Sequence, residues 1–155
     1  MGGHAEADVS SSYVEYRGKG FWSWDGYLEH ALALLADAVG PADSIQWLTA
    51  ARQHWHQQSS GAFAGWVHPS LDEYASTDER RQVLLGLLES VACRTDATLE
   101  VKATIQLLTA LLRGELRTDA ASPVDYMVTG QQPYAWVRER EATQQAVGPV
   151  GRAHG

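Results

Sequence analysis

The sequence has few of the residues that cross-link small proteins or bind metal ions. Cys93 is the only cysteine among 155 residues, which excludes a disulfide within the chain and a zinc site built from several cysteines. A lone cysteine is typical of proteins in a reducing compartment, so we expect a cytoplasmic protein. At this length one hydrophobic core can bury about 70% of the unfolded surface, and no cross-link is needed.

Long apolar runs and targeting signals are also lacking. The longest purely apolar run, residues 31–36, is far shorter than the roughly 20 residues of a membrane-spanning helix. Residues 1–12 show no basic segment followed by an apolar one, so we expect neither secretion nor membrane contact. Their polar composition, rich in glycine and serine, predicts a disordered arm.

Positive charge is scarce in the first half of the chain. The formal net charge is −7, and residues 1–79 contain eleven acids but only three bases. Such a surface repels phosphate backbones, which argues against nucleic-acid binding and favours a basic protein as partner. The alternative is that mild acidity only keeps the protein soluble.

Sequence motifs of common catalytic and metal sites are absent. There is no G-x-S-x-G, no Walker loop and no H-E-x-x-H. His54 and His56 lie two residues apart, so on a helix they point about 200° apart and cannot hold one ion together. We therefore expect no metal and no cofactor, and we assign no catalytic residue. Cys93 ends a leucine-rich helix and is predicted to be a small buried hydrophobe.

The strongest pattern in the sequence is an amphipathic helix within residues 20–39. Ser23 is placed to cap it, Asp25 puts negative charge in its first turn, and Gly40-Pro41 ends it. The predicted apolar stripe consists of Trp24, Leu28, Ala31, Leu32, Leu35 and Val39. Before this helix, residues 13–16 alternate like a short extended segment and residues 17–20 predict a turn.

Three more main helices are predicted from capping boxes and apolar spacing. The first runs from Asp43 to about Gln57, with Ile45 among its core positions, and the second from Thr77 to about Arg94, with Val83. A third follows Thr95-Asp96 and ends at Gly114.

These patterns predict an all-α domain over residues 13–147, with about four main helices in two antiparallel hairpins. Short C-terminal helices are expected over residues 122–129 and from Pro133. Residues 148–155 are expected to be a disordered tail.

The connection over residues 58–70 combines two glycines and a proline with large apolar residues. Such loops are uncommon, so the apolar side chains either fold back as a plug over the helices or form a binding surface. One helical turn, residues 71–74, follows and adds two carboxylates. The candidate partner-binding residues are Phe63, Trp66, His68, Asp72 and Glu73.

Six tryptophans are present, four of them on or just before the first two predicted helices. They either fill the space between helices or line a ligand pocket. The candidate pocket residues are Trp22, Trp24, Trp47 and Trp55.

Several short patterns together resemble small bacterial proteins that are similar in size and acidity to immunity proteins of polymorphic toxin systems. The patterns are the lead from Tyr16 to Trp22, Asp25-x-x-Leu28-Glu29, the Trp55 helix with Gly61-x-Phe63-x-Gly65, and the Asp78–Arg81 box. The resemblance covers residues 16–90 and rests on aromatic and structural residues. It implies a partner-binding role, and no site residues are carried over from it.

Three functional hypotheses follow. The first is a non-enzymatic, acidic, cytoplasmic binding protein of immunity type that neutralises a toxin or effector domain. The second is a small-molecule-binding helical domain with a tryptophan-lined pocket. The third is an enzyme that uses carboxylates near residues 58–74.

Overall fold

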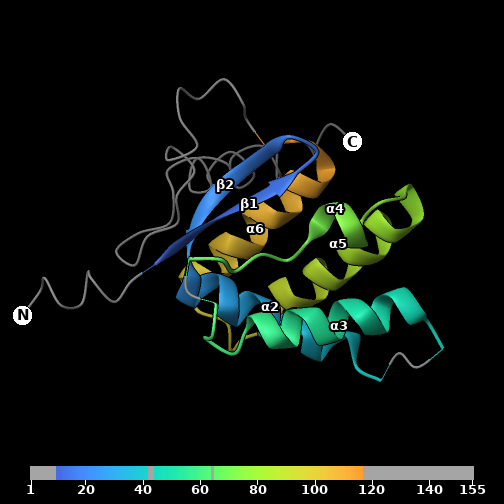
Figure 1. Cartoon of the computed structure of the whole chain (residues 1–155), viewed down its shortest axis with the longest axis horizontal. Coiled ribbons are helices and arrows are strands. Elements are labelled where there is room, and N and C mark those ends of the chain that lie inside the picture. The colour runs from blue at the N-terminus through green and yellow to red at the C-terminus, as the bar shows by residue number, and fades with distance from the viewer. Residues whose placement is uncertain (1–9, 42–43, 64, 117–155) are drawn as a thin grey trace, which may run out of the picture.

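Two β-strands precede the helices, so the fold is α+β and the all-α prediction is wrong (Figure 1). The computed structural model describes residues 10–41, 44–63 and 65–116. Strands β1 (Ser11–Tyr16) and β2 (Lys19–Trp24) pair antiparallel. The helices described are α2 (Asp25–Val39), α3 (Gln46–Gln58), α4 (Leu71–Tyr74), α5 (Asp78–Ala92) and α6 (Leu99–Arg113).

The β-hairpin forms because its turn and its alternating side chains suit two paired strands. Arg17 and Gly18 have φ angles of 52° and 82°, the pair of positive values that a two-residue type I′ turn requires. Val14 pairs with Phe21 on the face toward the core, where both are fully buried. Sequence periodicity did not predict β2, because residues 20–24 also fit the start of the amphipathic helix expected within residues 20–39.

The start of α2 differs from the prediction because β2 extends to Trp24. Ser23 is not a helix cap: it lies in β2, and its hydroxyl donates to the Trp24 carbonyl at 3.2 Å. Trp24 occupies the N-cap position without a side-chain hydrogen bond, and Asp25 is the first helical residue, as expected for an acid in the first turn. Ser11 and Ser12, assigned to the disordered arm, belong to β1.

Helix α2 is the centre of the core, packing against α3, α5 and α6. Its predicted stripe is confirmed at Leu28 and Leu35, which are 0% and 3% exposed. The β-hairpin lies over α6 in Figure 1 and contacts it through both strands. Fully buried large side chains of the remaining elements include Trp55, Val67, Val91, Ile105, Leu107, Leu108 and Leu112.

The later helices begin and end largely where local signals place them. Thr77 caps α5 by accepting a hydrogen bond from the Arg80 amide at 3.2 Å, and Gly114 ends α6 with φ 72°. Helix α3 begins at Gln46 rather than at Asp43, which lies outside the described residues. Ile45 and Val83, predicted as core positions, are exposed.

Several predictions fall outside the part of the chain that the structure describes. They are the helices over residues 122–129 and from Pro133, the tail at 148–155, and residues 1–9 of the arm. Within the described residues, every helix is too short or too polar to cross a lipid bilayer.

Candidate functional site

The segment of residues 65–70, between α3 and α4, is held to the rest of the fold by side chains, and we call it the anchored segment. The Gly65 amide donates to Asp25 Oδ2, and the Val67 amide donates to Ser12 Oγ at 3.0 Å. The His68 amide donates to Gln58 Oε1 at 3.1 Å. Each of these acceptors comes from a different element, so the backbone is fixed without being part of a sheet.

The other side of the anchored segment is fixed through its carbonyls. The indole nitrogen of Trp55 donates to the Pro69 carbonyl at 2.9 Å, and Trp55 itself is fully buried. His54 Nε2 lies 3.1 Å from the His68 carbonyl oxygen. Helix α3 therefore holds the segment with two consecutive side chains.

Asp25 connects the anchored segment to both the hairpin and α2. Its carboxylate is buried and accepts the Ser12 hydroxyl at 2.6 Å, in addition to the Gly65 amide. Its own amide donates to the Ser10 carbonyl at 2.7 Å. The predicted place of Asp25 in the first turn of the helix is confirmed, but its burial and its hydrogen bond to Gly65, 40 positions away, were not predicted from the sequence.

The pKa of Glu29, one turn after Asp25 on α2, is shifted by its surroundings. Partial burial, and secondarily the negative charge of Asp25, raise the pKa of the Glu29 carboxyl above its ordinary value of 4.5. Residues i and i+4 of a helix are neighbours, so two carboxylates there repel each other.

The anchored segment and Phe63 just before it have apolar side chains both in the core and in solvent. Val67 is 0% exposed, whereas Trp66 is 76% exposed and Phe63 is 39% exposed. A tight turn, in which the Trp66 amide donates to the Phe63 carbonyl at 2.7 Å and Gly65 has φ 81°, directs the two aromatic residues away from the core. Of the large apolar residues in this connection, Val67 thus packs into the core, whereas Phe63 and Trp66 do not fold back over the helices and are exposed.

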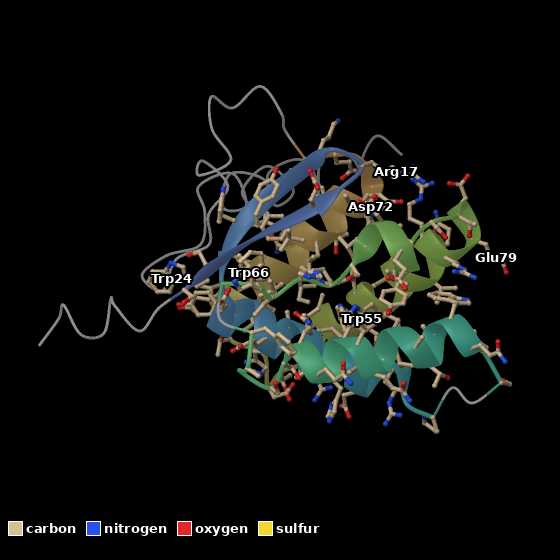
Figure 2. All side chains as sticks on the ribbon, in the orientation of Figure 1. Arg17, Trp24, Trp55, Trp66, Asp72 and Glu79 are labelled. Atoms are coloured by element: carbon tan, nitrogen blue, oxygen red, sulfur yellow. The ribbon has the colours of Figure 1, made fainter. Side chains whose placement is uncertain are left out.

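Two acids follow the anchored segment on α4. Asp72 Oδ1 accepts the Arg17 amide at 3.0 Å, which ties α4 to the turn of the hairpin. Figure 2 shows Trp66 near Trp24 and Asp72 near Arg17, at opposite ends of the hairpin. The five candidate partner-binding residues all lie in the connection after α3 or in α4. We call them the α3–α4 surface: Phe63, Trp66, His68, Asp72 and Glu73.

A cavity of about 370 Å³ opens beside α4. Three carboxylates, Glu15, Asp72 and Glu73, are part of its wall. The other lining residues are Tyr13, His68, Pro69, Ser70 and Leu71. Three negative charges in one concave site favour a cation over an anion.

Two residues of the cavity wall, His68 and Ser70, lie close to His54 on α3. Ser70 Oγ lies 3.1 Å from His54 Nε2 and 3.2 Å from His68 Nδ1. The two imidazole ring centres are 5.8 Å apart. Partial burial, and secondarily the nearby His54, lower the pKa of His68 below 6.5. Sequence reasoning missed Ser70, because His54 is 16 positions away and only the fold brings it close.

The four candidate pocket tryptophans each pack in a different place. Trp22 contacts Tyr13 across the hairpin, with ring centres 5.4 Å apart, and Trp24 stacks on Tyr27 at 5.8 Å. Trp47 lies under the Arg80 guanidinium at 5.0 Å. Trp55 is in the core, where the adjoining cavity of about 10 Å³ is too small for an organic ligand.

Two further sequence predictions concern Cys93 and metal binding. Cys93 is exposed, so the prediction of a buried hydrophobe is wrong: α5 ends at Ala92, and Cys93 is its C-cap residue. Within the described part of the chain, no three histidine, cysteine, aspartate or glutamate side chains gather closely enough to hold a metal ion.

Comparisons with protein-family models, curated proteins and solved structures find no match to this chain. The function proposed below therefore rests on the residues of the site.

Proposed function

We propose that this protein binds a basic protein partner through the α3–α4 surface. The observation that carries the proposal is Trp66: its indole is 76% exposed on a backbone that buried side chains hold in place. An exposed tryptophan costs free energy in water, and tryptophan is enriched among the residues that dominate binding energy. A rigid segment also loses little conformational entropy when a partner binds.

Charge supports a basic partner. Asp72 and Glu73 are exposed on the same α3–α4 surface, toward the turn of the hairpin, and Glu15 on β1 lines the cavity that both acids line. An aromatic centre with a charged rim is a common arrangement in protein interfaces. Rim charges of one sign raise the rate at which a partner of opposite sign is encountered.

We further propose a cytoplasmic immunity role, in which the partner is a toxin or effector domain. This step rests on the resemblance of residues 16–90 to small bacterial proteins of immunity type and on the acidity of residues 1–79. A bound inhibitor that covers a basic catalytic or nucleic-acid-binding face would neutralise such a domain.

The test is co-expression with the product of each adjacent gene in a bacterial host. If one product is toxic, the wild-type protein should restore growth and Trp66→Ala should not, although it folds normally. Ile45→Ala is the matched control, since Ile45 is also an exposed apolar residue but lies at the start of α3. Equal rescue by wild type and Trp66→Ala would exclude the α3–α4 surface as the binding site.

A further inference from the structure

Ser70 lies between two imidazoles at the wall of the 370 Å³ cavity. Its Oγ is within hydrogen-bonding distance of one nitrogen from each ring, at 3.1 Å from His54 Nε2 and 3.2 Å from His68 Nδ1. Ser70 and His68 line the cavity, whereas His54 is not among the lining residues.

The hydrogen-bond partners determine which atoms carry hydrogen. His54 Nε2 lies 3.1 Å from the His68 carbonyl oxygen, and a carbonyl can only accept, so this nitrogen must be the donor. The same N–H then faces Ser70 Oγ, which accepts from it. The Ser70 hydrogen is left to donate to Nδ1 of a neutral His68, which is the arrangement of a nucleophile and its base.

The backbone at Ser70 is also unusual. Its φ and ψ angles are 54° and 52°, in the left-handed region that residues other than glycine rarely adopt. Such a conformation is strained for a residue with a side chain, and strained residues are concentrated at functional sites. Here it turns the chain from the anchored segment into α4 and sets the hydroxyl at the cavity wall.

We propose that Ser70 is a nucleophile with His68 as its general base, and that the cavity takes small, positively charged esters. The negative charges of Glu15, Asp72 and Glu73 would attract a cationic ester and repel an anionic one. The Tyr13 ring provides an aromatic wall that a quaternary ammonium group can contact.

The reaction is acyl transfer to serine followed by hydrolysis. Ser70 Oγ forms a bond to the ester carbonyl carbon while His68 Nδ1 takes the hydroxyl proton. The bond between carbonyl carbon and alcohol oxygen then breaks, and His68 returns its proton to the departing alcohol. Water next attacks the acyl-serine, giving its proton to His68. The acid departs, and the proton returns to Ser70.

His54 is a positioning residue in this scheme. Its N–H fixes the Ser70 oxygen and the His68 carbonyl at once. Titratable groups on three elements surround Ser70 and His68. They are Tyr13 and Glu15 on β1, His54 on α3, and Asp72, Glu73 and Tyr74 on α4. Burial, and secondarily His54, lower the pKa of His68, which favours the neutral imidazole that a general base requires.

The first experiment treats the full chain with a fluorophosphonate probe and locates the adduct by mass spectrometry. We expect Ser70 to be labelled at least about 10²-fold faster than serines of the urea-unfolded chain, a ratio within the usual gain from a general base. Ser70→Ala and His68→Gln should lose that labelling, and Ser76→Ala, which changes an exposed serine near α4, should keep it. Labelling of native Ser70 no faster than in urea would overturn the nucleophile assignment.

The pH dependence of labelling tests His54. Labelling of the wild type should rise as His68 loses its proton and then level off. In His54→Gln, the side-chain amide can still donate to Ser70, but the influence of His54 that lowers the pKa of His68 is gone, so the midpoint should move to higher pH. A uniformly lower rate with an unchanged midpoint would contradict the positioning role.

The second experiment compares two nitrophenyl esters of equal size, one with a trimethylammonium group and one with a carboxylate. We expect the cationic ester to acylate Ser70 at least about 10-fold faster at low salt, because surface attraction of this kind weakens with ionic strength. Equal or reversed rates would overturn the proposed ester class. Neither experiment involves a protein partner, so both are independent of the binding role proposed above.

Discussion

Asp25 and Ser12 form a buried hydrogen bond of 2.6 Å that joins the first residue of α2 to β1. The Ser12 oxygen in turn accepts the Val67 amide, and the other carboxylate oxygen of Asp25 accepts the Gly65 amide. Two side chains therefore connect the helix, the hairpin and the anchored segment. The exposed position of Trp66, between Gly65 and Val67, is a direct consequence.

Removing the Ser12 hydroxyl should destabilise the fold. Ser12→Ala leaves the buried Val67 amide without this acceptor and removes the donor to Asp25 Oδ1, and a buried unsatisfied group costs about 1–3 kcal/mol. Ser11→Ala, on the opposite face of β1, is the control and should change the free energy of unfolding by less than about 0.5 kcal/mol. Urea denaturation measures both, and equal midpoints would contradict the bridging role.

Trp66 and Val67 should separate binding from stability. Val67→Ala removes two methyl groups from a fully buried side chain and should cost about 1–3 kcal/mol of stability. Trp66→Ala should leave stability within about 0.5 kcal/mol of wild type and weaken partner binding by at least about 2 kcal/mol. Urea denaturation and calorimetric titration with the purified partner give the two quantities. Loss of stability in Trp66→Ala with unchanged affinity would contradict the surface assignment.

The acids of α4 should act mainly on the rate of association. In the double variant Asp72→Asn with Glu73→Gln, the carboxamide oxygen introduced by the first substitution can still accept the Arg17 amide, so the fold should be retained. The association rate with a basic partner should fall and lose much of its salt dependence, while dissociation changes little. Stopped-flow measurements at two ionic strengths check this, and a change confined to the dissociation rate would show that these charges are not at the rim.

Glu29 should make stability depend on pH. Its pKa is raised in the folded state, so folding is favoured by the protonated carboxyl and disfavoured once it ionises. The carboxyl is only partly buried, so the effect is modest. Glu29→Gln should be more stable than wild type at pH 7, and the difference should vanish below the ordinary pKa of 4.5.

Exposed Glu89 provides the comparison for Glu29, through Glu89→Gln. Urea denaturation of the three proteins at pH 7 and at pH 4 measures the dependence. A Glu29→Gln variant less stable than wild type at pH 7 would show that the carboxylate is stabilising, contrary to the direction of its pKa.

Much of the helical part of the fold was predictable because its signals are local. The stripe of α2, the Thr77 cap of α5 and the Gly114 end of α6 each depend on residues within a few positions of one another. The partner-binding candidates were also visible, since a loop with large apolar residues and glycines is unusual by itself. Whether those candidates bind a partner remains a prediction.

Other features were not predictable from local patterns. β2 overlaps the helical pattern that begins at Trp24, and a strand is defined by its pairing with another strand. The burial of Asp25 and the environment of Ser70 depend on hydrogen bonds to residues 40 and 16 positions away, respectively. Neither spacing corresponds to a helical or strand repeat.

The sequence by itself determined where the main helices of the described residues lie, because apolar periodicity and capping are interactions between near neighbours. It also determined the acidity of the first half and the presence of an aromatic loop. Only the tertiary structure decided that Val67 enters the core while Trp66 faces water, and that Ser70 meets two histidines. The physical reason is that buried hydrogen-bond donors must find acceptors, and here the acceptors lie on elements far apart in the chain.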